Sequence, residues 1–329
     1  MAAPLSTQDR HTPVLLERVV DLLRPALTQP GAVFVDGTLG MGGHTERVLR
    51  CCPHARAIGI DRDPAALELA CQRLAPYGDR FVAVQAVFDE LPSVLASQRV
   101  DRPHALLFDL GVSSLQLDEQ ERGFAYRIDA PLDMRMDQQQ GVTAADVLNT
   151  YSASDLERIL RDFGEERFAR KIARAMVRAR NDVPFTTSAP LVQLLAAAIP
   201  QAAQRSGGHP AKRTFQALRI EVNRELSVWS AALPLALEAL ALGGRIAVLS
   251  YHSLEDRITK QGLSAAVTSS APPDFPVELP EQRPWARLLT RGAEKATSQE
   301  IDNNPRAASV RLRAAERTRE TASHHRSTR

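Results

Sequence analysis

The sequence predicts an α/β protein in which a mostly parallel, Rossmann-like sheet is interrupted by an inserted, mostly helical domain. Four short apolar runs alternate with helical patterns between residues 32 and 108, which is the spacing of right-handed strand–helix–strand units. Each run is continuously apolar, as is typical of strands buried on both faces of a sheet. A fifth run follows only after a gap of more than a hundred residues, and the pattern of that gap is mostly helical.

Composition limits the class of protein. The chain has 329 residues, of which 44% are hydrophobic and 24% charged, so it is globular, and its length suggests two domains. The longest apolar stretch, 231–242, contains Pro234 and Glu238 and is too short to span a membrane. Residues 1–10 lack the apolar segment of a secretory signal, and only three cysteines are present, so we expect a cytoplasmic protein. The net charge of +2, taken alone, argues against a nucleic-acid partner.

The first elements follow from a helix cap and from the apolar runs. Thr12 and Pro13 predict the start of a helix, because Thr is a frequent N-cap and Pro suits the first helical position. The first four strands are expected at 32–35, 57–60, 81–84 and 105–108.

The later elements complete the sheet. A long helix is expected from Arg213 to about Leu242, where a Gly-Gly pair stops it, and the fifth strand is expected at 245–249. Two further runs, 287–290 and 310–313, are expected to close the sheet as an antiparallel pair. The expected domains are a core in two parts (1–112 and 213–317), a helical insert (113–212) and a disordered tail (318–329).

A glycine-rich loop at 36–44 lies directly between the first strand and the next helix. Glycines there permit a tight turn and let a ligand approach backbone N–H groups at the start of the helix. The nicotinamide fingerprint fails, because the sixth position counted from Gly40 is Thr45 rather than Gly. The phosphate-loop pattern also fails, because no Gly-Lys-Ser/Thr follows. An adenosyl ligand without phosphates is therefore favoured.

Three further residues follow successive strands. Asp61 is placed to accept hydrogen bonds from a ribose diol, Phe88 to cover an adenine ring, and Asp109 to lie near the reacting group. Each of them alone is more often an ordinary loop acid or core residue. Together with the glycine loop they predict a nucleoside-type cofactor site at the carboxyl ends of the strands.

The chain contains six ordered motifs, at residues 11–16, 36–44, 109–114, 131–137, 213–220 and 250–257. Together they resemble the MraW family of S-adenosylmethionine-dependent methyltransferases, which modify the exocyclic N4 of a cytosine in the decoding region of 16S rRNA. The resemblance extends from His11 to about Arg317, and the sequence departs from the common pattern at Leu115, Thr45 and Ala308.

The resemblance implies a class I methyltransferase core with an inserted substrate-recognition domain. It implies S-adenosyl-L-methionine as cofactor and 16S rRNA or the small ribosomal subunit as partner, with no DNA and no membrane. Two of the implied cofactor contacts, His44 and Gln116, come from the resemblance alone. The cofactor-binding residues are expected to be Gly42, Gly43, His44, Asp61, Phe88, Asp109 and Gln116.

The chemistry that the resemblance implies points to Asp109 as the catalytic residue. An aromatic amine is a poor nucleophile, so it must be aligned with the methyl group and must donate a hydrogen bond to an acceptor. We expect Asp109 to contact the cofactor, the amine or both. Tyr251 or His252 is expected to help hold the base, although a purely structural hydrogen bond is an equal alternative for His252. No metal-ligand spacing occurs, so no metal is expected.

RNA contact is expected to be local, because the global charge is nearly balanced. Residues 167–180 contain six basic and no acidic residues, and a helix there either binds phosphates or is simply solvated on that face. Residues 305–329 contain seven Arg and two Glu and are a candidate basic arm. A polar row on the helix that starts at Arg213 either reads the target base or orders the insert: Gln216, Arg219 and Asn223.

Two other functions remain open from the residues. One is a methyltransferase that acts on protein or on a small molecule. The other is an RNA-binding ribosome assembly factor that retains the fold without the activity. The sequence does not indicate an oligomeric state.

Overall fold

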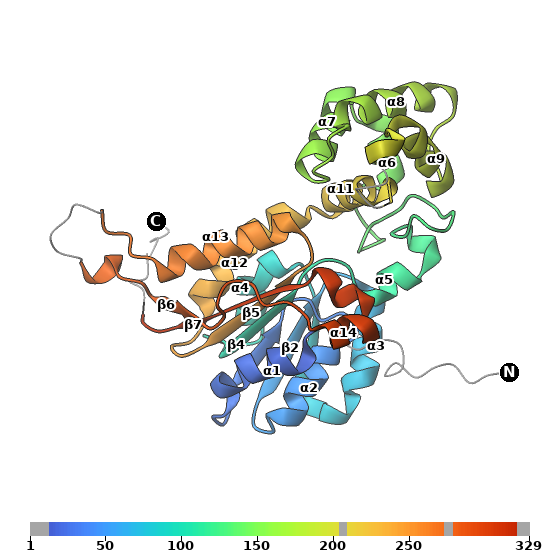
Figure 1. Cartoon of the computed structure of the whole chain (residues 1–329). Helices are drawn as coiled ribbons and strands as arrows, with labels where there is room; N and C mark the ends of the chain where they lie inside the picture. Colours follow the sequence, from blue (N-terminus) through green and yellow to red (C-terminus); the bar gives the residue numbers. More distant parts are fainter. Residues whose placement is uncertain (1–12, 204–208, 273–278, 321–329) are drawn as a thin grey trace, which may run out of the picture. The chain divides into compact units, whose positions relative to one another are not determined.

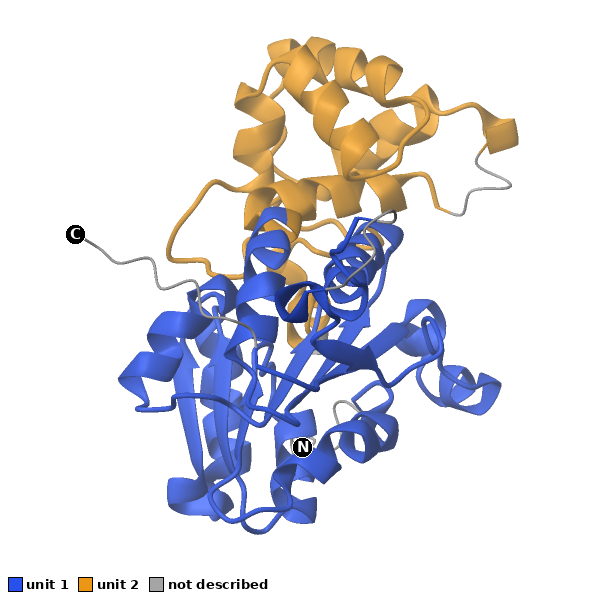
Figure 2. Cartoon of the chain, turned by 90° about the vertical axis from the view of Figure 1, so that its left-hand side faces the viewer, with its two compact units in different colours: residues 1–111, 227–329 blue, residues 112–226 orange. Residues whose placement is uncertain are grey.

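A computed structural model describes residues 13–203, 209–272 and 279–320 (Figure 1). The chain forms two compact units (Figure 2). The core unit comprises Met1–Gly111 and Ser227–Arg329, and the insert unit comprises Val112–Leu226. No helix within the described residues is both long enough and apolar enough to cross a membrane.

The core unit contains a seven-stranded sheet in the order β3-β2-β1-β4-β5-β7-β6. The first five strands pair in parallel, and β7 runs antiparallel between β5 and β6, so the predicted mostly parallel sheet is confirmed. The strands are β1 (Val33–Asp36), β2 (Arg56–Asp61), β3 (Phe81–Gln85), β4 (Ala105–Asp109), β5 (Arg245–Ser250), β6 (Ala286–Leu288) and β7 (Arg311–Arg317).

Helices cover both faces of this sheet, as continuous apolar strands require. In β1, Phe34 packs into one hydrophobic cluster, whereas Val33 and Val35 pack into another on the opposite face. The helices of the core are α1 (Leu16–Leu23), α2 (Gly43–Cys51), α3 (Pro64–Leu74), α4 (Leu91–Ser97), α12 (Glu225–Ala239), α13 (Ser253–Val267) and α14 (Ser298–Asn303). Short 3-10 helices lie at Arg24–Leu27, Ala75–Arg80, Phe88–Glu90, Gln120–Arg122, Pro280–Gln282 and Pro305–Ser309.

The insert unit has a hydrophobic core of its own, which includes the buried side chains of Leu148, Ile159, Ile172, Leu191 and Leu218. It is mostly helical, as predicted. Its helices are α5 (Ser114–Asp118), α6 (Ala144–Thr150), α7 (Ala153–Asp162), α8 (Ala169–Asp182), α9 (Ser188–Ala198) and α11 (Ala211–Asn223).

The first helix begins later than expected. It starts at Leu16 rather than at Pro13, and Leu15 before it has a left-handed backbone with φ 52°. The backbone N–H of Leu15 donates to Glu300 Oε1 at 2.6 Å, so a distant carboxylate caps this helix. Thr12, the expected cap, lies outside the described residues, as do residues 321–329 of the expected tail.

The prediction of one long helix from Arg213 to about Leu242 is also wrong, because the structure has two helices in this region. Arg224 has φ 54°, which ends α11, and α12 starts at the next residue. Arg219 and Glu225 make a two-pronged ion pair at 2.8 and 2.9 Å across this break. The insert unit therefore extends to Leu226 rather than to Lys212, because α11 packs its apolar side chains into the core of the insert.

The polar row on α11 holds the insert together. Gln216 Nε2 donates to the carbonyl of Phe163 at 2.9 Å. Asn223 Nδ2 donates to the Met134 carbonyl at 2.7 Å, and its Oδ1 accepts from the Met136 N–H at 2.8 Å. Of the two expected roles for this row, the contacts support ordering of the insert.

Replacement of Asn223 by Ala is expected to destabilise the insert. The substitution leaves the buried Met136 N–H and Met134 carbonyl without these partners, which costs about 2 kcal/mol of unfolding free energy. Urea unfolding followed by circular dichroism measures the change. Gln193→Ala, on an exposed position of α9, is the control and should change the unfolding free energy by less than about 0.5 kcal/mol. Equal stability of both variants would contradict the bridging role of Asn223.

Candidate active site

The candidate site lies at the carboxyl ends of β1, β2 and β4. From β1 the chain adds β2 and then β3 toward one edge of the sheet. Strand β4 then pairs with the other edge of β1, and the chain continues toward the opposite edge of the sheet. Ligands of open α/β sheets bind at such a point, where the strand order reverses. Each of the three strands ends in an aspartate: Asp36, Asp61 and Asp109.

Asp61 braces the glycine loop. Its Oδ2 accepts the Gly40 N–H at 2.8 Å and its Oδ1 accepts the Asp63 N–H at 2.9 Å. Burial raises the pKa of the Asp61 carboxyl. A carboxylate has about four acceptor positions, so about two remain for hydroxyl donors. The loop contacts of Asp61 are a role that sequence reasoning missed.

Gly42 occupies a conformation that favours glycine. Its φ is 77°, and a Cβ added there would lie 2.9 Å from the Leu74 side chain. Gly43 begins α2, and a Cβ there would lie 2.5 Å from Pro13. The loop therefore keeps its backbone close to α3 and to the segment before α1.

Asp36 is a buried acid that sequence reasoning did not include in the site. It accepts hydrogen bonds from the Thr45 hydroxyl at 2.8 Å and from the Thr38 N–H at 3.2 Å. Burial raises its pKa to about 6. Its position as an acid at the end of a strand is the same signal that identified Asp61 and Asp109, so the sequence contained the information.

His44 lies in the first turn of α2 and is buried. Its Nε2 is 3.1 Å from the Val14 carbonyl, so Nε2 carries the proton and Nδ1 is left as an acceptor. Burial lowers the pKa of the imidazole, which favours the neutral ring. The Nδ1 atom faces Asp109 Oδ2 at 3.8 Å.

Asp109 is held on two sides and remains partly accessible. Its Oδ1 accepts the Tyr251 hydroxyl at 2.7 Å, and its backbone N–H donates to Thr38 Oγ1 at 2.6 Å. The side chain keeps 24% of its surface exposed, so a ligand can reach it. Burial raises its pKa to about 7, the nearby Glu255 adds to this effect, and the Tyr251 hydrogen bond opposes it.

Tyr251 and His252 connect β5 to α13. Burial and the neighbouring Asp109 raise the pKa of Tyr251 well above its ordinary value, so its hydroxyl stays a donor. His252 is the N-cap of α13, and its side chain accepts the Glu255 N–H. Glu255 in turn accepts the Tyr251 N–H at 2.7 Å. These contacts give His252 Nδ1 a structural role and identify Glu255 as a further member of the site. The buried Nε2 of His252 lies 3.1 Å from Glu255 Oε1, and the expected contact of His252 with the base stays a prediction.

Phe88 lies in a short 3-10 helix after β3. Its ring makes edge contacts with Phe108 and Trp229, with centroids 5.9 and 6.0 Å apart. The Arg62 guanidinium lies over the Phe88 ring at 6.0 Å from the centroid. These neighbours fix the orientation of the ring beside the Asp61 strand end.

Gln116 belongs to the insert unit. It is buried, its Oε1 accepts the Ser113 N–H at 3.0 Å, and its own N–H donates to Ser113 Oγ at 3.3 Å. This reciprocal pair caps α5. Its expected cofactor contact stays a prediction.

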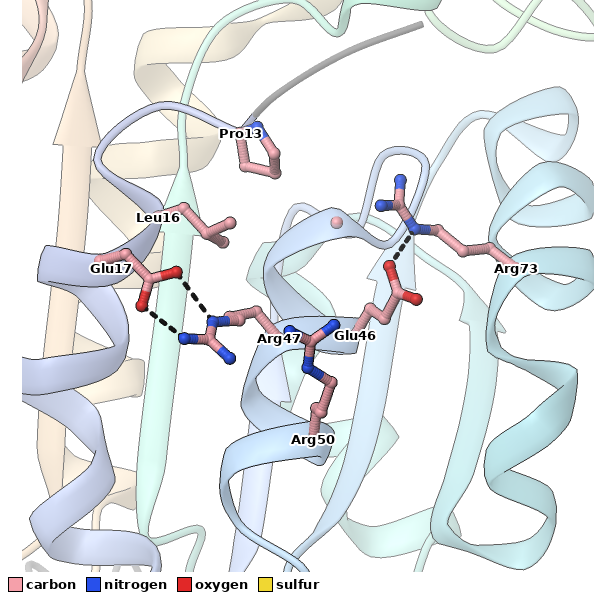
Figure 3. Close-up of a pocket in the computed structure, with 8 residues that line it drawn as sticks. Pro13, Leu16, Glu17, Glu46, Arg47, Arg50 and Arg73 are labelled. Atoms are coloured by element: carbon pink, nitrogen blue, oxygen red, sulfur yellow. Dashed lines mark hydrogen bonds and ion pairs between the residues drawn. The ribbon is translucent and has the colours of Figure 1, made fainter. Parts of the chain in front are cut away.

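A pocket of about 340 Å³ adjoins the glycine loop at Gly43 (Figure 3). Two ion pairs lie in its lining: Arg47 to Glu17 at 2.7 Å, and Arg73 to Glu46 at 2.6 Å. These pairs connect α2 to α1 and α3. They hold the helix that carries His44 and Thr45 in place.

Comparison with known proteins agrees with this geometry. A model of the MraW methylase family matches residues 8–318. "Ribosomal RNA small subunit methyltransferase H" of Thermobifida fusca (strain YX) is 64% identical over 310 residues, covering 94% of each chain. The protein of the same name from Nocardioides sp. (strain ATCC BAA-499 / JS614) is 64% identical over 308 residues, covering 94% of this chain and 97% of the relative. This chain therefore belongs to the MraW methylase family.

Proposed function

We propose that this chain transfers a methyl group from S-adenosyl-L-methionine to the exocyclic N4 of a cytosine in the decoding region of 16S rRNA. Membership of the MraW methylase family supports the transfer of a methyl group. The name shared by the relatives at 59–64% identity supports small-subunit rRNA as the substrate. A reaction on ribosomal RNA belongs to the cytoplasm, where ribosomal subunits are made.

The core unit offers groups that fit the cofactor. Asp61 retains about two acceptor positions for the hydroxyls of a ribose. At Gly40 of the glycine loop, the nearest atom to an added Cβ is the Thr38 carbonyl oxygen at 4.0 Å, so that side of the backbone is open to close approach. The Phe88 ring supplies an apolar surface for an adenine. When bound, S-adenosylmethionine supplies an electrophilic methyl group on a positively charged sulfur.

The observation that carries the chemistry is the partly exposed Asp109 carboxylate, held by the Tyr251 hydroxyl, with its pKa of about 7. The Tyr251 hydroxyl occupies Oδ1, so Oδ2, which lies 3.8 Å from His44 Nδ1, is the oxygen left to accept an N–H of the target amine. That hydrogen bond concentrates the nitrogen lone pair. As the N–C bond forms, the bond between the methyl carbon and sulfur breaks and the nitrogen takes on a positive charge. The nitrogen then loses one proton, and a carboxylate with this pKa is suited to accept it near neutral pH.

The proposal is tested by mass spectrometry of 16S rRNA from a strain that lacks the gene. The decoding-region cytosine should lose one methyl group, and expression of this chain should restore it. An unchanged cytosine would refute the proposal. Methyl transfer to a protein or small-molecule fraction would instead support the alternative methyltransferase. Failure to bind S-adenosylmethionine in calorimetry would favour an assembly factor without the activity.

Asp109→Asn is expected to lower kcat by about 10²- to 10³-fold, because the amide cannot accept the proton of the amine. The affinity for S-adenosylmethionine, measured by calorimetry, separates the two expected contacts of Asp109. A change of less than about threefold assigns Asp109 to the amine, and a larger loss assigns it to the cofactor as well. Asp101→Asn, an exposed position, is the matched control and should leave kcat unchanged. Normal turnover in Asp109→Asn would remove Asp109 from the mechanism.

The rate should depend on pH through Asp109. Its carboxylate form increases as pH rises through about 7, so single-turnover rates should rise from pH 6 to 8 and then level off. Tyr251→Phe removes a hydrogen bond that lowers this pKa, so the midpoint should move to higher pH. Tyr77→Phe, which alters a hydroxyl bonded to the Glu46 carbonyl, should leave the midpoint in place. A midpoint unaffected by Tyr251→Phe would contradict the assignment.

A further inference from the structure

Helix α8 of the insert unit has a fixed orientation. Ile172, Ala173 and Met176 are fully buried in the core of the insert, so the helix cannot rotate without exposing them. The opposite side of the helix and the turn before it carry five exposed basic residues, here called the basic stripe: Arg167, Arg170, Lys171, Arg174 and Arg178.

The charges of the basic stripe are uncompensated. Within the part of the chain that the structure describes, none of the five side chains makes a hydrogen bond or an ion pair. Of the two acids that precede the stripe, Glu165 is exposed, whereas Glu166 is buried and accepts the Phe168 N–H. Arg180, on the same helix, turns inward and donates to the carbonyls of Leu148 and Tyr151, both at 2.7 Å. The sixth basic residue of the segment therefore has a structural role that the stripe residues lack.

Elsewhere on the chain, arginines are commonly paired. Arg18 pairs with Glu294 and Arg47 with Glu17, each through two hydrogen bonds. A helix and its preceding turn with five unpaired cations and no acid between 167 and 180 are therefore a distinct local feature. The like charges repel one another, and a bound polyanion would relieve that repulsion.

We propose that the basic stripe binds the phosphate backbone of the rRNA substrate; this proposal rests on the proposed function. Arg170, Arg174 and Arg178 recur at intervals of four residues, so successive cations lie about 6 Å apart along the helix axis. Guanidinium groups bind phosphate through two hydrogen bonds. Such contacts position an RNA without reading its sequence, so the choice of cytosine comes from other groups.

The side chains of the stripe favour RNA over a protein partner. The fully buried part of a protein interface is typically apolar. No large apolar side chain between 167 and 180 is exposed, so the surface is cationic throughout. A line of cations without an apolar centre fits a sugar–phosphate backbone.

The test is a triple variant, Arg170→Gln, Lys171→Gln and Arg174→Gln, which preserves helix propensity. Direct binding of an rRNA fragment that contains the decoding region is measured between 50 and 300 mM salt. We expect about tenfold weaker binding at 150 mM salt. The slope of log affinity against log salt concentration should become less negative by about 2 to 3. The affinity for S-adenosylmethionine, measured in parallel, should stay unchanged.

A second triple variant controls for the loss of net charge. Lys260→Gln, Arg291→Gln and Lys295→Gln remove three exposed cations from the core unit. In this variant, the slope of log affinity against log salt concentration should differ from that of the wild type by less than about 1. An equal loss in both variants would mean that net charge, and not the stripe, controls binding, and would overturn the proposal.

The remaining outcomes separate the stripe from the methylation reaction. Wild-type affinity and salt dependence in the stripe variant would overturn the stripe proposal while leaving the methylation intact. A defect seen only on assembled subunits, with normal binding of naked RNA, would indicate an acidic ribosomal protein as the partner and would also overturn it. The wild-type chain could bind RNA through the stripe and yet methylate no rRNA. That result would support the stripe proposal and refute the proposed reaction.

Discussion

The candidate site of the core unit depends on the convergence of three carboxylates, of which Asp36 is buried and Asp61 and Asp109 are partly buried. Parallel pairing of β1 with β2 and β4 brings the carboxyl ends of these strands to one edge, and each ends in an aspartate. Buried carboxylates are costly unless they are hydrogen-bonded, so the surrounding loops supply donors. The glycine loop donates to Asp61, Thr38 and Thr45 donate to Asp36, and Tyr251 donates to Asp109.

This arrangement gives the three acids different tasks. Asp36 fixes the turn after β1, because its oxygens accept hydrogen bonds from that turn and from α2. Asp61 keeps acceptor capacity beside the glycine loop. Asp109 alone combines partial exposure with a pKa of about 7. Environment, rather than residue type, therefore distinguishes a structural acid from a candidate proton acceptor.

Charge has to be considered at the scale of a single helix. The net charge of +2 argued against a nucleic-acid partner, yet it averages paired and unpaired cations. Arginines such as Arg18 and Arg47 are neutralised by neighbouring glutamates, whereas those of the basic stripe are not. Short-range pairing thus leaves the unpaired charge on α8, where a global sum does not reveal it.

The sequence by itself determined the strands, the insertion and the acids at the strand ends, because continuous apolar runs and glycine loops are local signals. The sequence did not predict the helix start after Leu15, because that start depends on a cap from the distant Glu300. It also did not predict the helix break at Arg224, because that break depends on a left-handed backbone angle at one residue. It also missed that Asn223 bridges Met134 and Met136, since those residues meet only after α11 packs into the insert. The tertiary structure alone decided burial and hydrogen-bond partners, and hence the pKa of Asp109, because these depend on residues far apart in the chain.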